Sequence, residues 1–192
     1  DGWRCYRGAV DVTAEDALTL TAFAVGGGSP IFNPDALRMQ RTLPQDHSFA
    51  QRVLHFVRAE RLCTRRRIGP IVVLHSLAGC ARQPMHTDYD ARAVGRHASK
   101  PLGVLVALQD DSRLCLAERD VQLSCGDVVV FDGDLVHAGA AYASGNTRVH
   151  LYLDTESVHR VPNSTYVVGD KTGATDGAPE DAVTVSDAMD GV

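Results

Sequence analysis

The spacing of apolar residues changes along the chain, from a helical period to the short runs typical of β-strands. Within residues 46–64 the apolar side chains recur at helical spacing, and arginines fall mostly between them: Phe49, Val53, Phe56, Val57 and Leu62. This pattern predicts an amphipathic helix. Weaker signals predict a short helix from Ala14 to Leu18, before a Gly-Ser-Pro break, and another from Pro34 to Met39, with Asn33 as its N-cap.

After Gly69-Pro70 the apolar runs become short, and Gly, Asp, Asn and Ser punctuate them. We predict strands over residues 71–77, 102–108, 113–117, 121–123, 128–131 and 148–153. Helices followed by many short strands favour an α+β protein whose core is an antiparallel barrel or a jelly roll.

A chain of 192 residues is long enough to bury one core of ordinary size. We predict three parts: an N-terminal helical region (1–69) that packs on the barrel, a barrel core (70–162), and a C-terminal extension (163–192). The last part is rich in Gly, Asp, Thr, Ser and Ala, so we expect it to be acidic and flexible.

Composition excludes several classes of protein. Apolar content of 44% and charged content of 22% are ordinary for a globular chain, and no apolar run reaches the length of a transmembrane helix. The five cysteines are widely spaced and include no C-x-x-C pair, which argues against a disulfide framework or a structural zinc site. We therefore expect reduced thiols and an intracellular protein, cytoplasmic or nuclear.

The net charge of −5 is unevenly distributed. Acids outnumber bases in residues 154–192, whereas residues 38–67 are rich in arginine. This is not the pattern of a globally basic nucleic-acid-binding protein. The arginine-rich stretch nevertheless keeps nucleic acid open as an alternative partner.

Candidate chemistry begins at His86-Thr87-Asp88. In an extended segment, His86 and Asp88 point to the same side. A third ligand is available from His137, which follows the predicted strand 128–131. One carboxylate and two imidazoles suit a divalent metal such as iron(II), and such a set leaves coordination positions open.

Strand alternation points to a second group of residues. Arg148, His150 and Tyr152 share one face of the predicted strand 148–153, and aliphatic residues share the other. Arg148 suits a bidentate clamp on a carboxylate such as that of 2-oxoglutarate. His150 and Tyr152 are candidates for further hydrogen bonds to that co-substrate or for substrate contact. His75, inside a predicted strand, is expected to be structural.

The motif order is H-x-D, then G-D-x-x-x-F-x-G-x-x-x-H-x-G, then an arginine on the next strand. This resembles the iron(II)/2-oxoglutarate-dependent dioxygenase superfamily over residues 70–153. The resemblance implies a double-stranded β-helix, with His86, Asp88 and His137 as the metal ligands and catalytic centre and Arg148 as the 2-oxoglutarate clamp. It also implies Fe(II), 2-oxoglutarate as co-substrate and O2, with ascorbate as an optional addition.

The sequence departs from several branches of that superfamily. Collagen-type prolyl 4-hydroxylases carry Lys at the position of Arg148. Alkylation-repair dioxygenases carry a second Arg where this chain has Asp154, and the plant small-molecule branch usually has Ser where this chain has His150. Halogenating relatives lack the acidic ligand, so Asp88 favours hydroxylation or oxidative demethylation.

Two alternatives stay open beside a dioxygenase acting on a small molecule or a protein. One is a nucleic-acid base oxygenase, for which the arginine-rich stretch is the only motive. The other is a barrel that keeps the metal site but serves as a binding or sensory module, because a fold does not fix a function.

Overall fold

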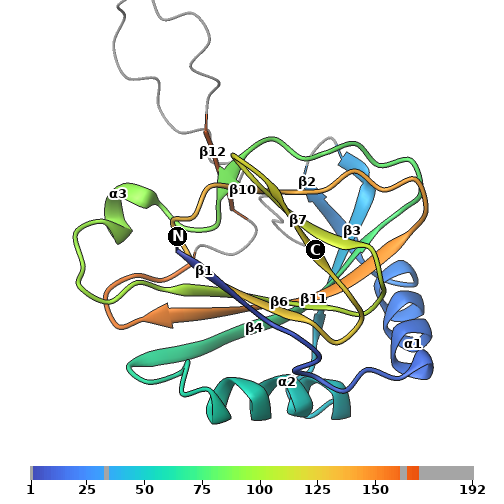
Figure 1. The fold of residues 1–192 in the computed structure, drawn as a ribbon, viewed down its shortest axis with the longest axis horizontal. Helices are drawn as coiled ribbons and strands as arrows, with labels where there is room; N and C mark the ends of the chain where they lie inside the picture. Colours follow the sequence, from blue (N-terminus) through green and yellow to red (C-terminus); the bar gives the residue numbers. More distant parts are fainter. Residues whose placement is uncertain (1, 33–34, 161–163, 169–192) are drawn as a thin grey trace, which may run out of the picture.

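A computed structural model of the chain describes residues 2–32, 35–160 and 164–168. In this part of the chain, two antiparallel sheets stack above two helices, and a single helical turn lies apart from these on the other side of the strands (Figure 1). The helices are α1 (Ala14–Val25), α2 (Ser48–Ala59) and the single turn α3 (Ala91–Val94).

The larger sheet has seven strands in the order β1-β9-β6-β11-β4-β3-β2. Its central strands β6, β11 and β4 are far apart in sequence and lie side by side (Figure 1). The strands are β1 (Trp3–Tyr6), β2 (Ser29–Phe32), β3 (Asp35–Leu43), β4 (Arg66–Ser76), β6 (Leu102–Ala107), β9 (Val128–Asp132) and β11 (Asn146–Thr155).

The smaller sheet has five strands in the order β12-β5-β10-β7-β8. They are β5 (His86–Thr87), β7 (Ser112–Leu116), β8 (Asp120–Leu123), β10 (His137–Gly139) and β12 (Tyr166–Val167). Among the described residues the strand pairs form two separate sheets and do not close a barrel by hydrogen bonding. The structure thus confirms a largely antiparallel β-protein with few helices.

The amphipathic helix predicted within residues 46–64 is α2. Phe49, Val53 and Val57 are fully buried on its inner side, while its arginines stay at the surface or half-buried. The helix ends at Ala59, and Arg61 has a left-handed φ of 55° that turns the chain toward β4. Helix α1 begins at a capping box formed by Thr13 and Asp16.

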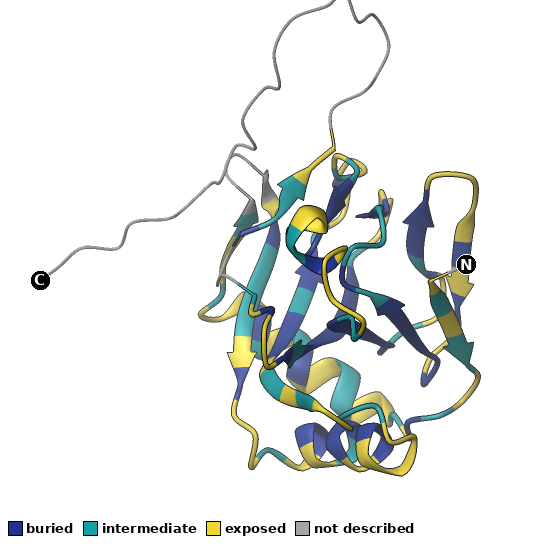
Figure 2. Ribbon diagram, turned by 90° about the vertical axis from the view of Figure 1, so that its left-hand side faces the viewer, coloured by how far each residue is buried: buried dark blue, intermediate teal, exposed yellow. Residues whose placement is uncertain are grey.

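Strand β11 separates two cores. Val149, Leu151 and Leu153 pack with α2 in one apolar cluster. Arg148, His150 and Tyr152 face the other way, toward the smaller sheet, as strand alternation predicted. The central strands are mostly buried (Figure 2). The row formed by Arg148, His150 and Tyr152 on β11 therefore lies between the two sheets, away from solvent.

A second apolar cluster joins the two sheets. Leu105, Val129 and Phe131 of the larger sheet pack against Leu114 and Leu123 of the smaller one. This packing fixes the distance between the sheets. It also leaves Arg148 and His150 of β11 buried between the sheets.

The helix predicted from Pro34 to Met39 is wrong. Residues from Asp35 form β3, which pairs with β4 from Arg38↔Ser76 to Leu43↔Ile71, whereas Asn33 and Pro34 lie outside the described residues. The local cap signal is overridden because the long β4 offers this segment a full ladder of hydrogen bonds. The patterns also did not predict β1, which pairs with β9.

The extension expected to be flexible from residue 163 is structured in its described part. Tyr166 and Val167 form β12 on the edge of β5, and Val168 N–H donates to the Met85 carbonyl at 2.8 Å. Residues 169–192 lie outside the described part. No helix in the described ranges is long and apolar enough to cross a membrane.

Candidate metal centre

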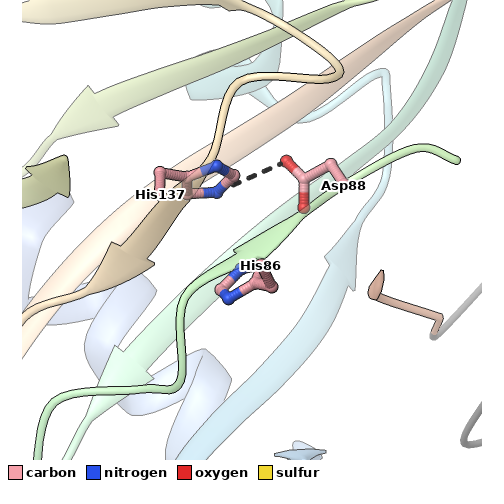
Figure 3. A group of neighbouring side chains, drawn as sticks. All are labelled: His86, Asp88 and His137. Atoms are coloured by element: carbon pink, nitrogen blue, oxygen red, sulfur yellow. Dashed lines mark ion pairs between the residues drawn. The ribbon is translucent and has the colours of Figure 1, made fainter. Parts of the chain in front are cut away.

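The smaller sheet brings together the three residues of the predicted ligand set. His86 on β5 is the direct cross-strand partner of His137 on β10, and Asp88 follows β5 immediately. All three are buried, and one possible ligand atom from each lies within 4.8 Å of the others. Figure 3 shows the three side chains converging on one point.

Both imidazoles are held in one orientation by the backbone. His86 Nδ1 lies 2.8 Å from the Pro84 carbonyl oxygen, and His137 Nδ1 lies 2.9 Å from that of Leu135. A carbonyl only accepts hydrogen bonds, so each Nδ1 carries a proton and each Nε2 is the nitrogen left to bind a metal. Metal-binding histidines are commonly oriented by such a contact.

Burial and the neighbouring charged groups shift the pKa values of the candidate ligands His86 and Asp88. Burial, together with the neighbouring His137, lowers the pKa of His86 to about 4. Burial alone would raise the pKa of Asp88, but His150, His137 and Arg160 outweigh it and the pKa is lowered. Neutral imidazoles beside an ionised carboxylate are the forms that a divalent cation binds.

One atom at this point lacks a protein partner. Asp88 Oδ2 is buried and has no hydrogen-bond partner, and it lies 3.8 Å from His137 Nε2. An unsatisfied buried carboxylate oxygen is costly unless something else binds it. The donor set and this orphaned oxygen fit a metal ion held by His86, Asp88 and His137.

Arg148 is buried on β11. Its guanidinium donates to Asn146 Oδ1 at 3.0 Å and to Ser76 Oγ at 3.2 Å. In the described part of the chain no carboxylate lies within 4.0 Å of it. Burial lowers the pKa of Arg148, but an arginine stays charged at neutral pH. A buried cation without an acidic partner suits an anionic ligand.

His150 and Tyr152 lie on the same face of β11 as Arg148 and also line the space between the sheets. His150 Nε2 lies 3.5 Å from Asp88 Oδ2, and the rings of His150 and Tyr152 are 4.3 Å apart. Burial lowers the pKa of His150 to about 3, so its ring is neutral. His75, in contrast, bonds the Thr147 hydroxyl at 2.8 Å and does not line the cavity described next, as expected of a structural residue.

One cavity joins the predicted residues. It is lined by the three candidate ligands, by Arg148, His150 and Tyr152, and by further residues from both sheets: Ile31, Gln40, Leu74, Gln83, Leu105, Arg113, Leu114, Phe131, Gly139, Arg160 and Thr165. The candidate metal centre and the candidate carboxylate clamp therefore face the same space.

Two residues near this site were not predicted to lie there. Arg38 on β3 is fully buried and donates to Ser76 Oγ at 2.9 Å, so one hydroxyl accepts from both Arg38 and Arg148. Arg160 lies after β11 and stacks over the Tyr152 ring at 4.0 Å. Neither arginine belongs to a motif, and only the fold brings each of them here.

No family model matches the chain, and no curated protein matches it. Its fold, however, is shared with solved structures. The viral collagen prolyl hydroxylase from Paramecium Bursaria Chlorella virus-1, in complex with 2-oxoglutarate, has a TM-score of 0.60 at 12% identity, over 81% of this chain and 97% of that one.

Two further structures give the same result. HygX from Streptomyces hygroscopicus, with nickel and 2-oxoglutarate bound, has a TM-score of 0.58 at 12% identity, over 81% of this chain and 83% of that one. SnoN, a non-heme α-ketoglutarate-dependent epimerase from nogalamycin biosynthesis, has a TM-score of 0.57 at 16% identity, over 97% of this chain and 92% of that one. At these identities the likeness establishes the fold: the chain has the fold of the iron(II)/2-oxoglutarate-dependent oxygenases.

Proposed function

We propose that this protein is an Fe(II)/2-oxoglutarate-dependent dioxygenase that hydroxylates or oxidatively demethylates its substrate. One observation carries the proposal: His86, Asp88 and His137 line the same cavity as the buried Arg148, which has no carboxylate within 4.0 Å in the described part of the chain. The shared fold supports it. In this proposal the two sheets form a double-stranded β-helix, and residues 70–162 are its catalytic core.

Each residue has a defined task. His86, Asp88 and His137 would hold the metal, and Arg148 would bind the distal carboxylate of 2-oxoglutarate. Iron(II) bound there supplies oxidation of a substrate C–H bond by O2, with conversion of 2-oxoglutarate to succinate and CO2. The Pro84 and Leu135 carbonyls keep both imidazoles turned toward the metal. The apolar cluster around Phe131 limits the access of water.

The contacts of the arginine-rich stretch favour a small-molecule substrate over nucleic acid. Much of the arginine-rich stretch is engaged within the protein: Arg38 is buried, Arg41 stacks over Phe23 at 4.0 Å, and Arg52 pairs with Asp16. Steep salt-dependent binding to DNA or RNA would contradict this preference.

The proposed function is tested by turnover and by ligand binding. With Fe(II) and 2-oxoglutarate, the protein should form succinate above the level of an Asp88→Ala control, including slow turnover without substrate. N-oxalylglycine, a 2-oxoglutarate mimic, should raise the melting temperature of the nickel-loaded protein. Stabilisation without succinate formation, across several candidate substrates, would instead favour a binding or sensory module.

The role of Arg148 predicts a specific loss. Arg148→Gln removes the charged fork that would bind the distal carboxylate. We expect the affinity for N-oxalylglycine to fall by about 10- to 100-fold, because hydrogen bonds to charged groups contribute roughly 1.5–3 kcal/mol. Calorimetry on the nickel-loaded protein measures this affinity, and the exposed Arg96→Gln is the matched control. An unchanged affinity in Arg148→Gln would remove Arg148 from the co-substrate site.

A further inference from the structure

The cavity contains more positive charge than the proposed reaction uses. Among its described lining residues Asp88 is the one acid, whereas Arg113, Arg148 and Arg160 all contribute guanidinium groups. A divalent metal, Asp88, Arg148 and a doubly charged 2-oxoglutarate would together be neutral. The charges of Arg113 and Arg160 remain beyond this set. Arg113 donates to the Ala141 carbonyl at 2.9 Å in an exposed position, whereas Arg160 lies at the candidate metal centre. Asp154 Oδ1 accepts from the Arg160 backbone N–H at 3.1 Å and forms no ion pair with its guanidinium within 4.0 Å.

Arg160 lies on the opposite side of the candidate metal centre from Arg148. Along β11 the inward-facing residues follow in the order Arg148, His150, Tyr152, about 6.6 Å apart at each step. Asp88 lies against His150, and Arg160 lies against Tyr152. Along this face of β11, His150 with the neighbouring Asp88 therefore comes between Arg148 and the stacked pair of Tyr152 and Arg160. A co-substrate clamped by Arg148 thus leaves the place of Arg160 to a second ligand.

The Arg160 side chain is held in position but is only partly satisfied. Its guanidinium carbon lies 4.0 Å from the centre of the Tyr152 ring, and Nη2 donates to the Ser164 carbonyl at 3.0 Å. Its Nε is buried and has no hydrogen-bond partner. Within the described ranges no carboxylate lies within 4.0 Å of this side chain. This stacked guanidinium therefore keeps hydrogen-bonding capacity for a ligand in the cavity that it lines.

We propose that Arg160 binds a carboxylate of the substrate, so that the substrate is a small organic acid with an apolar body. This inference rests on the proposed function and names the substrate class of the same site. A planar carboxylate matches the fork of a guanidinium group, and the remaining cavity wall suits an apolar body: Ile31, Leu74, Leu105, Leu114 and Phe131.

The test measures binding with turnover switched off. Nickel-loaded protein saturated with N-oxalylglycine is titrated with small monocarboxylic acids of increasing apolar size. Each acid is paired with its primary amide, which has the same shape without the charge, and phosphate monoesters form a third series. We expect acids to bind at least about tenfold more tightly than their amides, since a charge-assisted hydrogen bond is lost in the amide.

Variants assign that preference to Arg160. Arg160→Gln should abolish the tenfold preference for acids, and Arg160→Lys should keep part of it, because Lys keeps the charge but loses the fork. Arg96→Gln removes an equal charge from an exposed position away from the cavity and should keep the full preference. If Arg160→Gln does not fold, Arg160→Lys still reports through a reduced preference.

Four outcomes would overturn the inference: no acid of the panel binds, acids and amides bind equally, the preference survives in both Arg160 variants, or phosphate esters bind more tightly than carboxylates. These outcomes are distinct from failure of the proposed function. That failure appears earlier, as absence of N-oxalylglycine binding to the nickel-loaded wild-type protein.

Discussion

Asp88 supplies the only negatively charged side chain among the three candidate ligands, beside the imidazoles of His86 and His137. Its Oδ2 is buried without a hydrogen bond, and its nearest polar neighbours are His137 and His150. Because Oδ2 forms no hydrogen bond, it adds little to the stability of the folded protein. We expect Asp88 to contribute to metal affinity instead.

Replacing Asp88 should therefore affect metal binding strongly. Loss of a residue that only hydrogen-bonds to a metal ligand typically lowers metal affinity by roughly 10- to 100-fold. Asp88→Ala would remove a ligand itself, so we expect a larger fall in the affinity for nickel(II) or cobalt(II). Isothermal titration calorimetry on the purified apoprotein measures it. The exposed Asp11→Ala is the control. A change below about threefold in Asp88→Ala would show that the metal binds elsewhere.

Two kinds of local contact hold the elements around the site. Helix α1 depends on its capping box, in which Asp16 accepts from the Thr13 backbone at 2.8 Å and Thr13 Oγ1 accepts from the Asp16 backbone at 3.1 Å. Strands β6 and β9 depend on a close fit, because Gly103 lies directly opposite Phe131. Each contact predicts a stability change.

The capping box predicts an acid-dependent loss of stability. Burial alone would raise the pKa of Asp16, but bonds from Thr13 and Arg52 lower it overall. A lowered pKa in the folded state stabilises the protein above the unfolded pKa of about 4, and this contribution is lost as the pH falls through the folded value.

We expect Asp16→Asn to reduce the free energy of unfolding by about 1 kcal/mol at pH 7. The difference from the wild type should shrink as the pH falls below about 4. Urea unfolding at several pH values measures both. Glu15→Gln, a neighbour in the first turn outside the capping box, should have a smaller effect; an equal effect would contradict the role of the box.

The fit at Gly103 predicts a coupled loss of stability and metal affinity. A Cβ at this position would lie 2.5 Å from Phe131 Cζ, and the Phe131 ring lies 4.7 Å from the ring of His137. Gly103→Ala should destabilise the protein by about 1–3 kcal/mol and weaken metal binding, because the displaced ring pushes on His137.

A double-mutant cycle tests this mechanism. In a Phe131→Leu background the ring is absent, so the cost of Gly103→Ala should be smaller. Thermal unfolding and metal titration are measured on the single and double variants. Equal costs of Gly103→Ala in both backgrounds would show that the clash with Phe131 is not the cause.

At the scale of the whole molecule, the site is built from segments distant in sequence. His86 lies on a two-residue strand between β10 and β12, and β12 belongs to the described end of the C-terminal stretch. Val168 N–H completes this edge by donating to the Met85 carbonyl at 2.8 Å. The segment from Ser164 to Val168 therefore helps to hold a metal-ligand strand.

Removing that donor should weaken the site without unfolding the protein. Val168→Pro lacks the backbone N–H, so we expect metal affinity to fall by a few-fold, up to about tenfold, with little change in melting temperature. Val168→Ala keeps the N–H and should match the wild type. A wild-type metal affinity in Val168→Pro would show that β12 does not support His86.

Patterns along the chain determined the features that depend on the spacing of neighbouring residues within one helix or strand. The periodic apolar residues around Phe49 and Val53 predicted α2, and the spacing of His86, Asp88 and His137 predicted three residues that the fold does bring together. Alternation on β11 likewise predicted that Arg148, His150 and Tyr152 share one face. Each depends on a period of 3.6 or 2 that neighbouring residues impose.

Only the tertiary structure decided the rest. A cap signal at Asn33-Pro34 predicted a helix where pairing with β4 imposes the strand β3, because a ladder of non-local hydrogen bonds outweighs a local preference. Arg38 and Arg160 reach the site from that strand and from beyond β11, at no characteristic spacing from the motif. The positive charge around the cavity, and with it the substrate class proposed for it, is thus a property of the packed molecule.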